Sequence, residues 1–96
     1  MEKLSDTTIQ EKLKSLDGWE YQDNCLVTTF EFQNFREAFT VMTRIAFECE
    51  DQQHHPDWTN VYNQLEIRLS THDAGGVTSK DFKLAGIIEK LVSEQP

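Results

Sequence analysis

The stretch PDWTNVYNQLEIRLSTH, residues 56–72, decides the fold because apolar and polar side chains alternate along its second half. This period of two is typical of a strand with one covered face. We expect two strands, from Trp58 to Tyr62 and from Leu65 to Thr71, joined by a tight turn at Asn63-Gln64. The apolar side of the second strand consists of Leu65, Ile67 and Leu69. Two strands joined this closely are antiparallel neighbours.

A second hairpin is predicted upstream of the first. A short strand at Trp19 to Tyr21 is followed by a turn at Asp23-Asn24. The run from Cys25 to Phe32 then alternates in character and is rich in β-branched and aromatic residues, which favour strands. Together the two hairpins supply four strands.

Helical patterns lie before and after this pair of hairpins. The first begins at Ser5 or Asp6, either of which can cap a helix, and ends at Asp17-Gly18. The last follows Thr78, which has Asp81 three residues on, a spacing typical of a capping box. Both helices are amphipathic, so we expect each to pack one side against the sheet.

The longest helical pattern lies between the hairpins. It starts after Asn34, with Glu37 at the capping-box position, and ends in the polar run at residues 50–53. Its apolar residues recur at spacings of three and four and form one wide face, which we expect to pack on the sheet. They are Phe35, Ala38, Phe39, Met42, Ile45, Ala46 and Cys49.

The predicted order is therefore α-β-β-α-β-β-α. We expect an α+β fold in which one four-stranded antiparallel sheet carries three helices on one face. The chain has 96 residues, which suits a single domain spanning residues 1–96. Because so small a core gives limited stability, self-association into a homodimer or homotetramer is expected.

Charge and composition exclude several classes of function. The chain has 17 acidic residues against 9 lysines and arginines, a formal net charge of −8. Nucleic-acid binding and anionic membrane surfaces both require clustered positive charge, which the sequence lacks. No apolar run approaches the ~18 residues of a membrane span, and no signal peptide is evident. We expect a cytoplasmic protein with Cys25 and Cys49 reduced, also nuclear if the source is eukaryotic.

All three histidines of the chain are predicted to meet at one sheet edge. His54 and His55 lie between the long helix and a strand, and His72 ends the partner strand of that hairpin. The hairpin returns the chain, so the residues before Trp58 lie beside those after Thr71. Pro56 also restricts His55 to an extended backbone, which fixes the direction of its side chain.

Three interpretations of this histidine cluster are open from the residues alone. Imidazoles titrate near neutral pH and can act as general acid and base. They can equally be solvent-facing loop residues. Three histidines can also bind zinc, but adjacent histidines rarely aim at one ion, so we expect no metal. Trp58 and Tyr62, at alternate strand positions, either pack in the hairpin or form a wall for a planar ring.

A wider set of spaced residues closely resembles the pterin-4a-carbinolamine dehydratases, from the first helix to the last. The resemblance rests on Glu50-x-x-x-His54-His55-Pro56-x-Trp58, Asn60-Val61-Tyr62-Asn63, Leu69-Ser70-Thr71-His72 and Asp81 before the last helix. It implies the same fold and a lyase that removes water from 4a-hydroxytetrahydrobiopterin, giving the quinonoid dihydropterin. That reaction recycles tetrahydrobiopterin for aromatic amino acid hydroxylases.

The resemblance also indicates which cofactors, ligands and protein partners to expect. Family members need no metal or cofactor, bind a small pterin and form dimers or tetramers. Some animal members bind a homeodomain transcription factor, so the alternative function is a non-catalytic binding or coactivator protein on the same fold. No separate motif for such a partner is present in this chain.

The resemblance assigns site residues position by position. His54, His55 and His72 match the family's catalytic histidines. The implied substrate-binding residues are Glu50, Gln53, Trp58, Ser70, Thr71 and Asp73. One residue departs from the pattern: many members have Asp directly before the two histidines, where this chain has Gln53. An amide can only hydrogen-bond, so we expect the tuning of His54 to differ.

Overall fold

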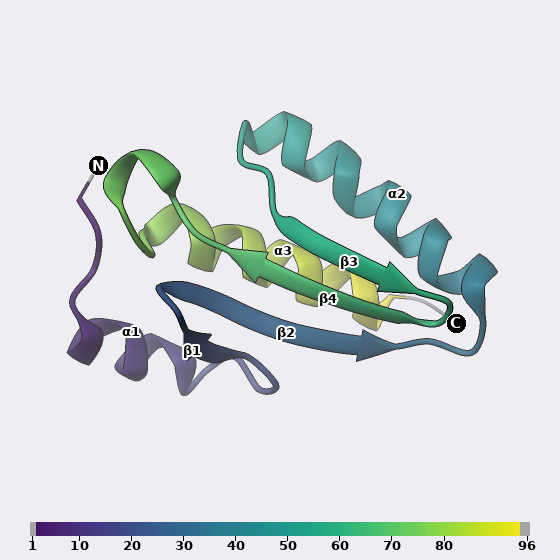
Figure 1. Cartoon of the computed structure of the whole chain (residues 1–96), viewed down its shortest axis with the longest axis horizontal. Helices are drawn as coiled ribbons and strands as arrows, with labels where there is room; N and C mark the ends of the chain where they lie inside the picture. Colours follow the sequence, from purple (N-terminus) through teal and green to yellow (C-terminus); the bar gives the residue numbers. More distant parts are fainter. Residues whose placement is uncertain (1, 95–96) are drawn as a thin grey trace.

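The computed structural model describes residues 2–94 and contains three α-helices and four strands in the predicted order, with one 3-10 turn that the sequence did not predict (Figure 1). The elements are α1 (Asp6–Leu13), β1 (Glu20–Gln22), β2 (Cys25–Glu31), α2 (Phe35–Gln52), β3 (Asp57–Val61), β4 (Gln64–Leu69), the 3-10 turn η1 (His72–Ala74) and α3 (Ser79–Ser93). None of these helices is long and apolar enough to cross a membrane.

The four strands form one antiparallel sheet in the order β1-β2-β4-β3. The two hairpins join through β2 and β4, which pair along Leu26↔Leu69 and Phe30↔Leu65. Strands β1 and β3 are therefore the edges (Figure 1). The predicted α+β architecture is confirmed.

The first hairpin turns where the sequence predicts, but the second does not. Asp23 and Asn24 both have positive φ, which suits a two-residue hairpin loop. In the second hairpin, Val61 pairs with Gln64, so the turn is Tyr62-Asn63 and the predicted turn at Asn63-Gln64 is wrong by one residue.

Hydrogen bonds explain the position of that second turn. The Asn60 amide nitrogen donates to the carbonyls of Tyr62 (3.0 Å) and Gln64 (2.9 Å). The Asn63 amide nitrogen donates to the carbonyl of Phe32 at 2.9 Å. These side chains satisfy turn and loop carbonyls that would otherwise be unpaired, so the turn falls between them.

One face of the sheet and the inner sides of all three helices share a single apolar core. Strand residues at alternate positions point into it, and Ile9 of α1, Ile45 of α2 and Leu84 of α3 meet them there. Burial of this apolar surface drives the fold. The buried strand residues are Leu26, Leu65, Ile67 and Leu69.

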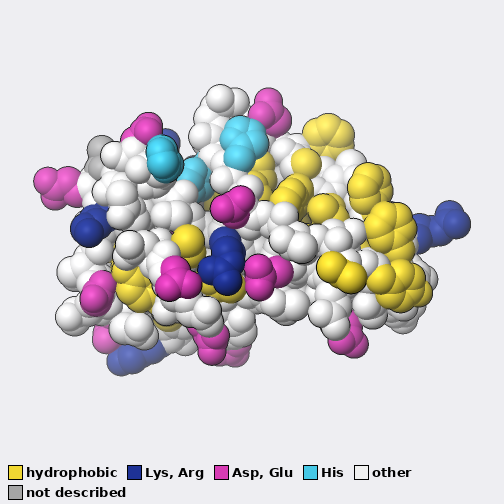
Figure 2. All heavy atoms as spheres, viewed as in Figure 1, with side chains coloured by type: hydrophobic (Ala, Val, Ile, Leu, Met, Phe, Trp, Pro, Cys, Tyr) yellow, Lys and Arg dark blue, Asp and Glu magenta, His cyan; other side chains and the backbone are white. Residues whose placement is uncertain are grey.

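The apolar face of α2 is only partly covered, which corrects the prediction for this helix. The core takes the stripe Ala38, Val41, Ile45 and Cys49. Phe35 and Phe39, predicted to face the sheet, are exposed, as is Phe47. The predicted face is wider than the strip of α2 that the sheet can cover. Figure 2 shows hydrophobic side chains gathered on the side of the molecule where α2 lies.

Candidate active site

The end of α2 separates the two adjacent histidines. Gln53, the C-cap residue of α2, adopts the left-handed conformation with φ 51° and ψ 44°. The chain then turns, and the His54 amide donates to the carbonyl of Cys49 at 3.0 Å. As a result the His54 side chain is buried while His55 is exposed.

His54 forms a buried pair with a carboxylate of α3. Its Nε2 lies 2.5 Å from Oδ1 of Asp81, whose side chain is completely buried. The other carboxylate oxygen accepts from the Thr78 amide at 2.8 Å and from the Thr71 hydroxyl at 2.9 Å. Asp81 lies in the first turn of α3, where the helix dipole favours a negative charge.

Asp81 therefore has two roles, of which the sequence predicts one. The predicted capping box with Thr78 is present and starts α3. The pairing with His54 joins two segments 27 residues apart and was not among the predicted site residues. The only sequence signal for it was the position of Asp81 in the family pattern.

His55 has a carboxylate partner as well, but in solvent. Its Nε2 lies 2.7 Å from Oε1 of Glu50, one turn back on α2, and the two side chains are 58% and 69% exposed. Exposed ion pairs contribute little energy and rearrange easily. Glu50, predicted to contact substrate, contacts His55 in this structure.

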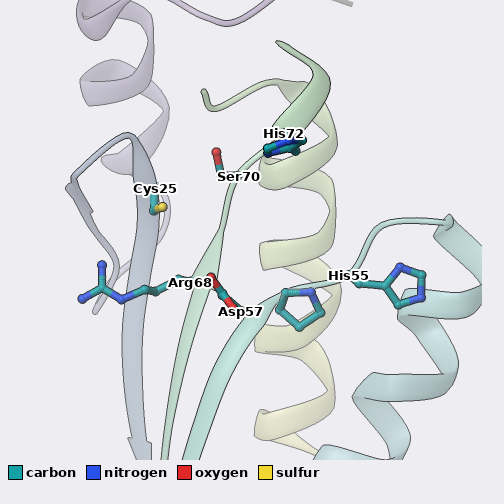
Figure 3. Close-up of a pocket in the computed structure, with 7 residues that line it drawn as sticks. Cys25, His55, Asp57, Arg68, Ser70 and His72 are labelled. Atoms are coloured by element: carbon teal, nitrogen blue, oxygen red, sulfur yellow. The ribbon is translucent and has the colours of Figure 1, made fainter. Parts of the chain in front are cut away.

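A cavity of about 240 Å³ opens beside these residues at the end of β4. Figure 3 shows His72 and Ser70 on one side of it, Cys25 and Arg68 across it, and the ring of His55 turned away toward α2. Pockets for drug-sized ligands span about 300–1,000 Å³, so a cavity of this size would take a smaller molecule, such as a small heterocycle. The lining residues are Cys25, His55, Pro56, Asp57, Arg68, Ser70 and His72.

The predicted convergence of three histidines is thus met in part. His55 and His72 line the cavity, whereas His54 does not and instead contacts Asp81 in the buried layer. Thr71 connects the buried His54–Asp81 pair with the cavity. Its hydroxyl donates to Asp81, while its neighbours Ser70 and His72 line the cavity.

Several predicted substrate contacts are placed away from this cavity. Trp58 pairs with Ile67 and packs against the core on the helix-covered face. Tyr62 lies in the turn, so the interpretation of Trp58 and Tyr62 as one aromatic wall is wrong. The Gln53 amide nitrogen donates to the carbonyl of Glu50 at 2.7 Å, and Asp73 is exposed in η1.

The sequence did not identify three of the lining residues, Cys25, Asp57 and Arg68. Arg68 is the only lysine or arginine among the cavity-lining residues, and its Nε donates to Glu66 at 3.3 Å. Burial raises the pKa of the Cys25 thiol, so it is no activated nucleophile. Within residues 2–94 no three His, Cys, Asp or Glu side chains are placed to hold a metal ion.

Comparison with known proteins decides the family. The model of the family described as pterin 4 alpha carbinolamine dehydratase matches residues 2–91. The chain belongs to the pterin-4a-carbinolamine dehydratase family. A relative of that name from Christiangramia forsetii is 66% identical over 96% of this chain and 95% of its own length. Another, from Prochlorococcus marinus, is 52% identical over 95% of each chain.

A solved structure of the family has the same fold. It is described as a transcriptional coactivator/pterin dehydratase from Brucella melitensis, and superposes with a TM-score of 0.90 at 35% identity. The match covers 93% of this chain and 97% of that one. The resemblance that the histidine segments imply is thereby confirmed, and the protein is an enzyme with pterin carbinolamine dehydratase activity.

Proposed function

We propose that the protein dehydrates 4a-hydroxytetrahydrobiopterin by histidine general acid–base catalysis, and that this recycles the pterin for aromatic amino acid hydroxylases. The observation that carries the mechanism is the buried His54–Asp81 pair, which Thr71 links to a cavity lined by His55 and His72. Metal and cofactor are not required by this chemistry, which involves proton transfers alone.

The reaction needs two proton transfers of opposite direction. The C4a–O bond breaks as the departing hydroxyl takes a proton and leaves as water. The ring nitrogen N5 loses a proton, and its electron pair forms the new N5–C4a double bond. The elimination needs no external oxidant or reductant. One imidazole acting as acid and another acting as base therefore account for both proton transfers.

The residues of the cavity fit this assignment. His55 and His72 are exposed and lie on different sides of it (Figure 3). Ser70 supplies a hydroxyl on the side of His72, and Arg68 and Asp57 supply polar groups for the pterin edge. Glu50 then acts on substrate through His55, and Thr71 acts through Asp81, which pairs with His54.

Single replacements of His54 and His55 by Ala test the mechanism. Each is expected to lower turnover by about 10²–10⁴-fold, the range of general acid–base catalysis. Turnover is followed as the ultraviolet decay of chemically generated 4a-hydroxytetrahydropterin. Gln10→Ala, an exposed change on α1, serves as the matched control. Full activity in both histidine variants contradicts the proposal.

A coactivator role is the second candidate, because the Brucella melitensis structure carries that word in its description. The exposed phenylalanines of α2 offer a surface for such a partner. A protein that binds a transcription factor but leaves the decay of the hydroxypterin unchanged would favour this role over the first.

A further inference from the structure

We propose that Asp81, clamped by Thr71 and Thr78, holds His54 as the Nε2–H tautomer, so that Nδ1 is the atom that accepts the substrate proton. The transfer of the substrate proton to Nδ1 rests on the proposed function. The tautomer of His54 follows from the geometry of four buried side chains and does not depend on the proposed function.

The hydrogen bonds around Asp81 can be ordered from donor to acceptor. The Lys80 amide donates to the Thr78 hydroxyl oxygen at 3.2 Å. The Thr78 and Thr71 hydroxyls are 2.7 Å apart, and the Thr71 hydroxyl donates to Oδ2 of Asp81 at 2.9 Å. Since Thr71 has a single proton, Thr78 is the donor between the two hydroxyls.

Each donor in this series of hydrogen bonds thus directs its proton toward Asp81. The Thr78 amide, which can only donate, is a second donor to Oδ2. Only Oδ1 is left to receive the proton of His54 Nε2. An ionised carboxylate is purely an acceptor, so the neutral His54 ring carries its hydrogen on Nε2.

The remaining ring nitrogen, Nδ1, is not closed off from solvent, although His54 itself does not line the cavity. Within residues 2–94, His54 Nδ1 is not among the fully buried polar side-chain atoms that lack a hydrogen-bond partner. Nδ1 of His54 makes no hydrogen bond to a described residue, so it keeps a path to solvent through the exposed tenth of its side chain. This nitrogen has a free lone pair in the Nε2–H tautomer.

The arrangement distinguishes His54 from the other two histidines. When Nδ1 takes a proton, the buried Asp81 carboxylate stabilises the imidazolium that forms, as in other carboxylate–histidine pairs. His55 has only an exposed partner and His72 is exposed in η1, so neither ring is held by a buried carboxylate. His54 is therefore the base for N5, and an exposed histidine delivers the proton to the departing hydroxyl.

Nitrogen NMR of the substrate-free protein tests the tautomer directly. In two-bond proton–nitrogen correlation spectra of the neutral His54 ring, wild type is expected to show a protonated Nε2 and an unprotonated Nδ1. Asp81→Asn can donate to Nε2 and is expected to favour the opposite tautomer, with kcat reduced by about 10²–10⁴-fold and KM little changed. An Nδ1–H tautomer in wild type overturns the proposal.

Replacements of Thr71 test the clamp without removing the carboxylate. Thr71→Val removes the hydroxyl at nearly constant volume, and is expected to lower kcat by about 10–100-fold and to populate both tautomers. Thr71→Ser keeps the hydroxyl and should restore the wild-type spectrum. If Val and Ser variants share one spectrum and one kcat, Thr71 has no positioning role. If only turnover fails in every form, wild type included, the proposed function fails while the tautomer stands.

Discussion

Gln53 shows how much of the site depends on one backbone conformation. Its left-handed φ ends α2 and sends His54 inward and His55 outward. The sequence identifies this position as a departure from the family pattern and predicts altered tuning of His54. In the structure its amide caps the carbonyl of Glu50 instead, so the side chain acts on the helix end. Non-glycine residues rarely adopt positive φ, so a glutamine in the sequence gives no sign that the backbone is left-handed there.

The strain at residue 53 leads to a stability prediction. Gln53→Val places a β-branched residue in the left-handed region and is expected to lower the free energy of unfolding by about 1–2 kcal/mol. Gln53→Gly removes the strain and serves as the comparison, with stability equal to or above wild type. Urea denaturation measures both. Equal losses in the two variants would show that the backbone conformation is not the cause.

Cys49 gives a second prediction at the residue scale. Burial raises the pKa of its thiol from 9.0 to about 11. The unfolded chain therefore loses this proton first, so stability is lost as the pH rises from about 9 to about 11. Cys49→Ala, although less stable at neutral pH, should show a smaller decline over this range. Parallel thermal unfolding curves for the two proteins across these pH values would contradict the prediction.

At the scale of elements, periodicity identifies each helix and strand, but it does not show how much of an apolar face is buried or the exact position of a turn. The two hairpins, the three helices and the capping box of α3 follow from spacing and cap residues. The predicted turn of the second hairpin lies one residue too late, because Asn60 fixes the turn from within the strand and both Asn63 and Gln64 suit a turn. The α2 face was overextended because its apolar width says nothing about the width of the sheet beneath it.

The role of Asn60 in the second hairpin can be measured. Asn60→Ala removes two hydrogen bonds to carbonyls of the turn and is expected to reduce stability by about 1–2 kcal/mol. Thr59→Ala, on the opposite face of the same strand, controls for the loss of a strand residue. Chemical denaturation compares them. A loss in Asn60→Ala no greater than in the control would remove this explanation of the turn.

At the scale of the whole molecule, the sequence could place the histidines at one sheet edge because hairpin topology returns the chain. It could not place Asp81 beneath them or Cys25 and Arg68 across the cavity, since both depend on long-range packing. The same packing explains why Trp58 lies in the covered layer: strand register, and not residue type, selects its face.

The exposed phenylalanines of α2 lead to a prediction about assembly. Phe35 and Phe39 stack with ring centroids 5.7 Å apart on the surface, and Phe47 is 68% exposed. Because exposed apolar patches mark interaction sites, we expect the protein to form a homo-oligomer through this helix. Phe39→Glu should shift it toward monomer in sedimentation velocity, and Gln10→Glu should not. A monomeric wild type would contradict the expectation.

The most direct test of the account is the decay of chemically generated 4a-hydroxytetrahydrobiopterin, followed by its ultraviolet absorbance with wild type, with His54→Ala and without protein. The account predicts strong acceleration by wild type and turnover about 10²–10⁴-fold lower for His54→Ala. A wild-type protein that leaves the decay at its spontaneous rate, or a His54→Ala variant as fast as wild type, would contradict it.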